Sequence, residues 1–417
     1  MKIKLVTLII LFSLPAFCAS ADSLKSELKS ANGINKVDIL NALALQLLKV
    51  DSKEAYHYAN EALDLSKKIS YNKGIGWALN NIALTYSEQN KNDEAYSFLQ
   101  KAKKIFIDIK NDAGLTECYD NIGDTHRFRG EIDSALFYYQ LTIPLFQKMG
   151  DKKGEAKAYS GVGLIYWRKG LNNEALNNFY IAYVIRKELG LKYETAMTLN
   201  NLGTIYWRFA NYEKALKYYS ESLQIREEIA DWRGEIITRG NIGLIFLKMK
   251  NYSKAESLFR DGLIRSKKEN YLFGMAYSNH SLGLLFLDKK EADSSIFYST
   301  NAVKYYYEIN EFNAVAHSLS YLGSAYSVKG NNKKARQFFQ AAIDTALKAN
   351  DNYSLTITYQ SIAKLHLEKG ETNAAEKYLK MAYEIAEKEN LTDLIIEHYL
   401  IFSDLLQKTG NVKGSFD

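Results

Sequence analysis

Residues 157–182 read KAYSGVGLIYWRKGLNNEALNNFYIA, and residues 197–222, forty positions later, read MTLNNLGTIYWRFANYEKALKYYSES. Both segments contain the string Ile-Tyr-Trp-Arg, with a glycine two residues before it and an alanine seven residues after it. Self-similarity at a fixed period of roughly 20–50 residues indicates an array of stacked structural units. This pair of segments therefore predicts a repeat architecture and gives its period.

The forty-residue spacing extends along most of the chain without insertion or deletion. Small residues recur at Ala55, Ala95, Ala135, Ala175, Ala215, Ala255, Ser295, Ala335 and Ala375. Glycine recurs, flanked by two alanines, at Ala83, Gly123, Gly163, Gly203, Gly243, Gly283, Gly323 and Ala363. The series predict one continuous solenoid, although a chain of 417 residues would suggest two or three domains at roughly 150 residues each.

Within one unit the spacing is helical. The first helix carries its inner residues at i, i+3, i+4 and i+7, at Tyr119, Ile122, Gly123 and His126, and the second carries Ala135, Tyr138, Tyr139 and Thr142. Glycine inside a helix costs about 1 kcal/mol relative to alanine, so the recurrent Gly123 position predicts close approach of the partner helix. A left-handed cap, which glycine adopts most cheaply, is predicted after the first helices at Gly130, Gly170, Gly330, Gly370 and Gly410, with Asn90 substituting once.

These positions resemble the tetratricopeptide repeat (TPR). The pattern is carried by Tyr119, Ile122-Gly123, His126, Ala135, Tyr139 and Thr142, and more closely by Tyr166, Ala175, Phe179 and Ala182 and by Tyr206, Ala215, Tyr219 and Ser222. The unit is longer than the usual TPR of about 34 residues and lacks its final proline. It is similar to the long-helix variant of kinesin light chains, of Leu-Gly-Asn-repeat spindle adaptors and of exported bacterial sensor proteins. The resemblance implies an all-α, right-handed solenoid whose first helices line a concave groove.

The chain is expected to have four segments. These are a signal peptide at 1–21, a lead-in at 22–34, nine helix hairpins at 35–390, and an incomplete tenth repeat or lone capping helix at 391–417. An end inside a repeat is also what a chain derived from a longer parent would show.

The N-terminus predicts export. Lys2 and Lys4 precede an apolar stretch that ends at Phe17, and Ala19-Ser20-Ala21 offers small residues for cleavage. The stretch is shorter than the ~20 residues that span a bilayer. Phe17 disfavours the alternative of a lipoprotein anchored at Cys18, because a small residue is expected there. We therefore expect a periplasmic or secreted protein with no membrane span in the mature chain.

The charge balance gives no sign of a nucleic-acid partner. Lys and Arg number 54 against 48 Asp and Glu, and no run of five like charges occurs. Cleavage would leave Cys118 as the single cysteine, which has no partner for an internal disulfide. Pro144, inside a second helix, is expected to kink it.

An asparagine ladder is the first candidate binding feature. The residue before the recurrent Leu-Gly or equivalent pair is asparagine in four of five consecutive repeats, at Asn81, Asn121, Asn201 and Asn241. An amide side chain both donates and accepts, so it can pair with the backbone of an extended peptide. Similar ladders hold peptides in the long-repeat relatives. The alternative is that each asparagine bonds the neighbouring repeat.

Aromatic and arginine side chains are the second candidate. Trp167-Arg168 and Trp207-Arg208 end the two identical strings, and Arg127 occupies the corresponding place one repeat earlier. These residue types are enriched in binding hot spots, and arginine can engage a carboxylate in two hydrogen bonds. The alternative is packing of one tryptophan on the other, with solvated arginines.

The sequence predicts no catalytic residue, cofactor or metal. No phosphate loop, dinucleotide fingerprint, nucleophile elbow or HExxH spacing occurs. We therefore expect an exported, non-enzymatic TPR scaffold that binds a protein or extended peptide in its groove. The alternative function is the periplasmic sensory input region of a membrane-bound histidine kinase or transcriptional regulator, with a membrane-bound signalling partner.

Overall fold

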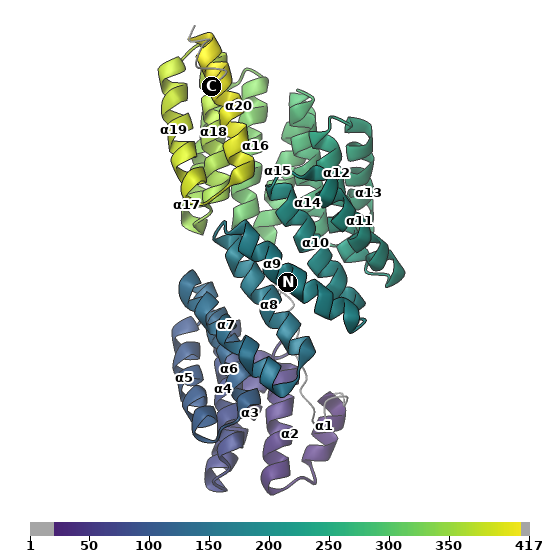
Figure 1. Ribbon diagram of the computed structural model, residues 1–417, viewed down its shortest axis with the longest axis vertical. Helices are drawn as coiled ribbons and strands as arrows, with labels where there is room; N and C mark the ends of the chain where they lie inside the picture. The colour runs from purple at the N-terminus through teal and green to yellow at the C-terminus, as the bar shows by residue number, and fades with distance from the viewer. Residues whose placement is uncertain (1–20, 410–417) are drawn as a thin grey trace. The chain divides into compact units, whose positions relative to one another are not determined.

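The computed structural model describes residues 21–409, and within that range every regular element is an α-helix (Figure 1). The helices of the first half are α1 (Ala21–Leu28), α2 (Gly33–Leu47), α3 (Ser52–Lys68), α4 (Asn72–Glu88), α5 (Asn92–Asp108), α6 (Asp112–Phe128), α7 (Ile132–Met149), α8 (Lys152–Arg168) and α9 (Asn172–Glu188). Those of the second half are α10 (Lys192–Arg208), α11 (Tyr212–Glu228), α12 (Trp232–Lys248), α13 (Tyr252–Lys268), α14 (Leu272–Asp288), α15 (Ala292–Glu308), α16 (Phe312–Val328), α17 (Asn332–Ala349), α18 (Asn352–Glu368), α19 (Thr372–Lys388) and α20 (Thr392–Lys408).

From α2 to α19 the described helices follow one another as nine hairpins, each made of an even-numbered first helix and an odd-numbered second helix. The all-α solenoid architecture predicted from the sequence is confirmed. The predicted signal peptide, except Ala21 at the start of α1, lies outside the described residues, as does the segment after Thr409.

The chain divides into two compact units, whereas the uninterrupted period predicts one continuous solenoid. Of the described residues, 21–168 and 177–185 form the N-terminal unit, and 169–176 and 186–409 form the C-terminal unit. The boundary falls within the fourth hairpin, where the forty-residue spacing continues unchanged. The forty-residue period therefore predicts where each hairpin begins, but it does not predict how closely successive hairpins pack.

The predicted caps are present. The backbone is left-handed at Gly130, Gly170, Gly330 and Gly370, with φ between 70° and 78°, and at Asn90, with φ of 59°. Gly410 lies outside the described residues. Ala210 adopts the same conformation with φ of 53°, although its Cβ disfavours it.

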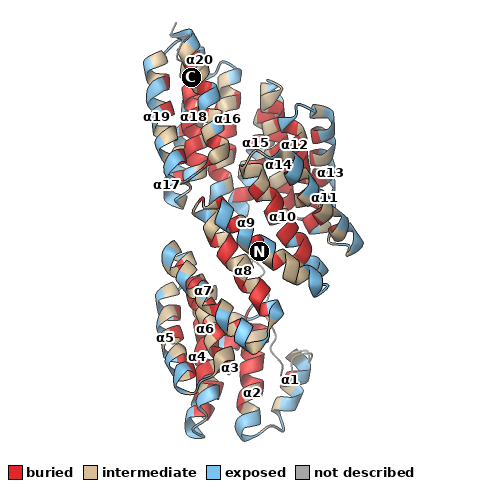
Figure 2. Cartoon of the chain, in the orientation of Figure 1, coloured by how far each residue is buried: buried red, intermediate tan, exposed pale blue. Residues whose placement is uncertain are grey.

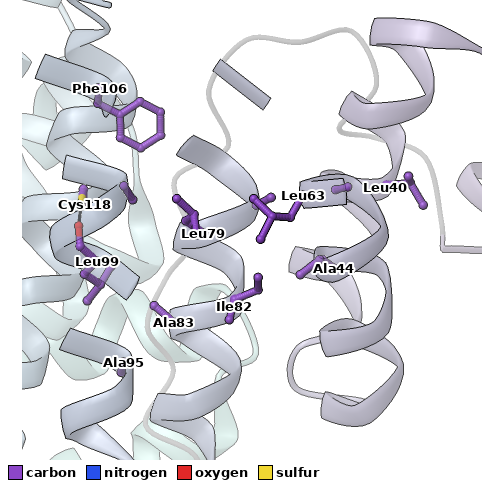
Figure 3. Packing of buried hydrophobic residues seen from close by; sticks show 14 of the residues in the cluster. Leu40, Ala44, Leu63, Leu79, Ile82, Ala83, Ala95, Leu99, Phe106 and Cys118 are labelled. Atoms are coloured by element: carbon purple, nitrogen blue, oxygen red, sulfur yellow. Dashed lines mark hydrogen bonds between the residues drawn. The ribbon is translucent and has the colours of Figure 1, made fainter. Parts of the chain in front are cut away.

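The two helices of a hairpin are buried differently. Second helices bury one stripe of four positions, as at Ala95, Leu99, Ala102 and Phe106 of α5. First helices such as α4 are buried on more sides because they pack on the second helices and on the next first helix (Figure 2). In the N-terminal unit, Leu79 and Ile82 of α4 lie between side chains of α2, α3 and α5 (Figure 3).

Close approach explains the recurrent glycine. A Cβ added at Gly123 would lie 2.8 Å from Cε1 of Tyr139, so the ring occupies the space that a side chain would need. This confirms the packing predicted for that position. Nearby, the Cys118 thiol is fully buried and donates to the Leu99 carbonyl oxygen at 3.1 Å, and burial raises its pKa to about 12.

Helix α20 packs on the preceding hairpin through Leu394, His398, Ile401 and Leu405. Among the helices of residues 21–409, none combines the length and the apolar character needed to cross a membrane.

Candidate functional site

First helices of several successive repeats contact one another, as α2 contacts α4 and α4 contacts α6, and a hydrogen bond from Lys157 to Asp120 joins α8 to α6. We call the surface formed by the first helices α4, α6 and α8 the N-terminal inner face. The asparagine, arginine and tryptophan residues predicted as a binding groove before residue 169 all belong to it.

Asn81 is buried, with 4% of its surface exposed. Its Nδ2 donates to the backbone oxygen and to Oδ1 of Asn41 in the preceding repeat, both at 3.1 Å. The structure therefore gives Asn81 the inter-repeat role that the sequence left open as the alternative to peptide holding.

Two other ladder residues make similar inter-repeat hydrogen bonds. Asn121 donates through Nδ2 to Oδ1 of Asn80 at 3.0 Å, and Asn241 donates to Oδ1 of Asn200 at 3.0 Å. The Oδ1 atom of Asn241 also accepts from the Tyr277 hydroxyl at 2.6 Å. Asn121 keeps Oδ1 and one N–H for another partner, whereas both polar atoms of Asn241 are engaged. Asn201 lies half-buried on α10.

Arg127 and Arg168 lie close enough to influence each other at the C-terminal ends of α6 and α8. Arg127 donates to Oδ1 of Asp124 through Nε at 3.1 Å and Nη2 at 2.7 Å, and Asp124 also accepts from the Tyr139 hydroxyl at 2.7 Å. Arg168 is exposed and makes no ion pair with another described residue. Desolvation, and then the positive charge of Arg127, lower the pKa of Arg168. A ligand carboxylate at this place would offset both effects on the pKa of Arg168.

The other end of the N-terminal inner face is acidic. Lys157 of α8 bonds the Asp120 carboxylate of α6, which joins the two repeats. The Glu117 carboxylate is half-buried and pairs with no described residue. Burial raises the pKa of Glu117, with Asp120 and Asp124 acting in the same direction and Lys157 opposing them. Glu117 and Arg127 are ten residues apart, which is about 15 Å along α6.

The two tryptophans belong to different units. Trp167 is half-buried on α8, in the N-terminal unit. Trp207 is half-buried on α10, and its ring centroid lies 5.2 Å from that of Tyr212 in the C-terminal unit. Their role as ligand anchors stays a prediction.

Arg208 binds a carboxylate of its own chain. Its Nη1 donates to Oδ1 of Asp393 on α20 at 3.1 Å, and its guanidinium lies 4.1 Å from the ring centroid of Tyr353. The Tyr353 hydroxyl donates to Oδ2 of the same aspartate at 2.8 Å. We call the Arg208–Tyr353–Asp393 group the closure contact, because it joins helices whose residues are 185 positions apart.

A second contact lies in the same unit. A Cβ added at Gly170 would lie 1.9 Å from the backbone oxygen of Glu389, in the turn between α19 and α20. Gly170 therefore meets two demands at once, since it also adopts a φ of 70°.

The first helices of the C-terminal unit carry neutral aromatic side chains beside the closure contact. The His280 ring centroid lies 4.8 Å from that of His317 and 4.9 Å from that of Tyr321. The Ser318 hydroxyl donates to a backbone oxygen, so His280 Nδ1, 2.8 Å away, is the donor in their hydrogen bond. Burial lowers the pKa of His280 to about 4, and burial, His280 and Arg208 together lower that of His317 well below its ordinary value.

Comparison with known proteins identifies the repeat. The sequence profile of the tetratricopeptide repeat matches residues 74–148, 154–228, 194–267 and 314–388, which together make up more than half of the chain. The chain belongs to the tetratricopeptide repeat family. A comparison with curated proteins finds no match.

Solved structures with a similar fold include the following three proteins. The Rap conjugation gene regulator of plasmid pLS20, in complex with the Phr* peptide, has a TM-score of 0.58 and 13% identity over 85% of this chain and 95% of that chain. The apo quorum sensor NprR from B. thuringiensis has a TM-score of 0.57 and 19% identity over 78% and 91%. Aspartyl phosphate phosphatase F from Bacillus subtilis has a TM-score of 0.59 and 14% identity over 78% and 87%. At these identities the similarity shows the TPR fold alone.

Sequence reasoning missed the charged residues of the N-terminal inner face. Glu117, Asp120, Asp124 and Lys157 do not recur at the forty-residue period, so the repeat pattern does not single them out. One of them does have a signal in the sequence, because Asp120 puts a charge at the repeat position where Asn80 and Asn200 are neutral.

Proposed function

We propose that this chain is an exported, non-enzymatic TPR scaffold that holds an extended peptide or protein segment on its N-terminal inner face. The observation that carries the proposal is a pair of charged groups that form no ion pair with another described residue, Arg168 at one end of that face and Glu117 at the other. An extended segment with an anionic group near Arg168 and a cationic group near Glu117 would neutralise both.

Further contacts on this face suit a peptide backbone. Asn121 retains one donor and one acceptor after its bond to Asn80. Gly161 takes the ladder position on α8, and a Cβ there would meet nothing closer than 3.9 Å, so the helix backbone can be approached closely. The peptide complex of the similarly folded Rap regulator supports this kind of ligand.

Export is supported by the N-terminal sequence. Lys2, Lys4 and the small residues Ala19-Ser20-Ala21 frame an apolar stretch of signal-peptide length. The cell fraction that contains the protein, together with the mass of its mature N-terminus, tests this part. Recovery of uncleaved chain from the cytoplasm would contradict it.

The binding test uses peptides recovered from the protein. The mature protein is captured from the native exported fraction, bound peptides are eluted and identified by mass spectrometry, and synthetic copies are titrated by calorimetry. Losing a hydrogen bond to a charged group costs about 1.5–3 kcal/mol, so Arg168→Gln and Glu117→Gln should each weaken binding by roughly 10- to 100-fold. Lys104→Gln, an exposed charge on the second helix α5, is the matched control. Equal affinity of all three variants and the wild type would contradict the proposed site.

The non-enzymatic part is tested separately because one similarly folded protein is a phosphatase. We expect no turnover of aspartyl phosphates by the purified protein. Turnover that persists in Arg168→Gln and Glu117→Gln would contradict that expectation.

A second candidate is the sensory input region of a membrane-bound histidine kinase or transcriptional regulator. The quorum-sensing role of the similarly folded NprR favours it. Sequencing of the reading frame beyond Asp417 tests it: a membrane segment and an output domain would support this candidate, and a stop codon there would count against it.

A further inference from the structure

A pocket of about 230 Å³ opens between the second helices α13 and α15 of the C-terminal unit. Asn279 of the first helix α14 completes its lining. Its lining residues are Arg260, Leu263, Ile264, Lys267, Asn279, Phe297, Tyr298, Asn301 and Tyr305. We call it the outer pocket.

The residue at the base explains why the pocket forms here. Asn279 is 2% exposed. At the same place in the forty-residue period, most other repeats carry a large apolar or aromatic residue, namely Ile39, Leu79, Tyr119, Tyr159, Leu199, Leu319 and Tyr359. Leu79, Leu199 and Leu319 are all buried, so they fill the space between their hairpins. Asparagine has the same reach as leucine but a smaller side-chain volume, which leaves part of that space open in this repeat.

Asn279 also changes the chemistry of the base. Its Nδ2 donates to the Met275 backbone oxygen at 2.7 Å, which leaves Oδ1 as an acceptor. The outer pocket therefore offers an acceptor to a hydrogen-bond donor on whatever enters it.

The walls are apolar and unusually exposed. Ile264 is 66% exposed and Phe297 is 61% exposed, and they face the pocket together with Leu263 and Tyr305. Small-molecule sites occupy about 300–1,000 Å³. A pocket of about 230 Å³ is closer to the size of one large side chain. Tryptophan and tyrosine are the residues that most often fill such pockets at interfaces.

The rim is positively charged. Arg260 and Lys267 line the outer pocket and no acidic residue does. Arg260 is held by Glu256 at 2.8 Å and by the Tyr298 hydroxyl at 3.0 Å. Lys267 is exposed and makes no ion pair with another described residue, so it remains available to an anionic group.

We propose that the outer pocket is a second binding site, for a tryptophan side chain that lies next to acidic residues in a partner protein. The indole ring would pack between Ile264 and Phe297, its N–H would donate to Asn279 Oδ1, and the neighbouring carboxylate would pair with Lys267. The site is independent of the N-terminal inner face, so a TPR scaffold holding a peptide there would keep a surface for a second protein.

The test uses the probe peptide acetyl-Asp-Trp-Asp-amide with 5-fluorotryptophan, followed by fluorine NMR on the full mature chain carrying Arg168→Gln and Glu117→Gln. That background removes the charged ends of the other site. We expect saturable binding of this probe at millimolar concentration, and at least several-fold weaker binding of acetyl-Lys-Trp-Lys-amide. Equal binding of the two probes, or no saturable binding of the acidic one, would overturn the proposal.

The decisive variant is Asn279→Leu, which installs the residue found at the same position in three other repeats. It should narrow the base of the pocket and remove the Oδ1 acceptor, which should weaken binding of the acidic probe at least tenfold, while the thermal unfolding midpoint stays level or rises. Lys267→Gln should weaken binding of the acidic probe several-fold. Lys268 does not line the pocket, so Lys268→Gln should leave the affinity for the probe unchanged. Wild-type affinity in Asn279→Leu would overturn the proposal. If Asn279→Leu lowers the unfolding midpoint, the comparison of Lys267→Gln with Lys268→Gln decides the question instead. Equal affinities of these two variants for the acidic probe would then overturn the proposal.

Discussion

The two Ile-Tyr-Trp-Arg strings have the same residues and end in different surroundings. In the N-terminal unit, Arg168 lies exposed beside Arg127 and pairs with no described residue. In the C-terminal unit, the Arg208 side chain is only 14% exposed and is held by Asp393 and Tyr353. The turn that follows is Lys169-Gly170 in one case and Phe209-Ala210 in the other.

The difference shows that repeat position fixes where a side chain stands but not what it binds. Both arginines were predicted to engage a carboxylate. For Arg208 that carboxylate comes from α20 of the same chain, whereas Arg168 makes no ion pair with another residue of the range 21–409. The arginine of the second string, Arg208, therefore stabilises the fold, whereas the arginine of the first string, Arg168, is available to a ligand.

The largest effect is expected from removing the guanidinium of the closure contact. Arg208→Gln leaves the little-exposed Asp393 without its cation, and breaking such a pair costs about 3 kcal/mol. Arg168→Gln, at an exposed site, should change stability by less than about 0.5 kcal/mol. Urea unfolding, with hydrogen exchange of α20 peptides as the local readout, measures both. Equal losses of unfolding free energy in the two variants would contradict the different roles of Arg208 and Arg168.

For each pH unit of acidification, an intermediate effect is expected on the stability of the C-terminal unit. In the folded chain the pKa of His280 is about 4 and that of His317 is also lowered, whereas a histidine of the unfolded chain has a pKa of about 6.5. Between these values the unfolded chain binds more protons, so stability falls as the pH falls, by up to about 1.4 kcal/mol per pH unit for each histidine. Denaturation series between neutral pH and pH ~4 measure this slope. The slope should be smaller in His280→Gln. An unchanged slope in that variant would argue against a lowered pKa of His280 as the cause.

The smallest effect is expected from exchanging the two turn residues. Ala210 has a φ of 53°, which glycine adopts without the Cβ penalty, so Ala210→Gly should stabilise by about 1 kcal/mol or slightly less. The reverse change, Gly170→Ala, should destabilise by more than that amount, because its Cβ would also meet the Glu389 backbone oxygen. Thermal unfolding of both variants checks the opposite signs.

The sequence was sufficient for the hairpins because their determinants are local and repeated. Gly123 and Tyr139 are sixteen residues apart, and a glycine recurs with an aromatic residue at this spacing, so the close approach could be predicted from the sequence. The caps at Gly130 and Asn90 follow from backbone preferences of single residues.

The candidate site was only partly predictable. Arg127 and Arg168 could be placed on the N-terminal inner face, but the burial of Asn81 depends on how tightly α4 packs against α2, which the period does not record. The closure contact pairs residues that belong to different positions of the repeat, Arg208 at the end of a first helix and Asp393 at the start of another. No regularity in the sequence connects them.

The closure contact also bears on how the C-terminal unit unfolds. In a linear repeat array each hairpin is stabilised only by its neighbours, so the ends fray first and melting spreads inwards. The closure contact links α20, the last described helix, directly to α10 near the start of the C-terminal unit. The entropic cost of closing such a long loop is modest, because it grows only by about 0.6 kcal/mol for each doubling of the loop length. The hairpins between the two helices should therefore open together, as a single cooperative block, while those of the N-terminal unit remain free to fray one by one.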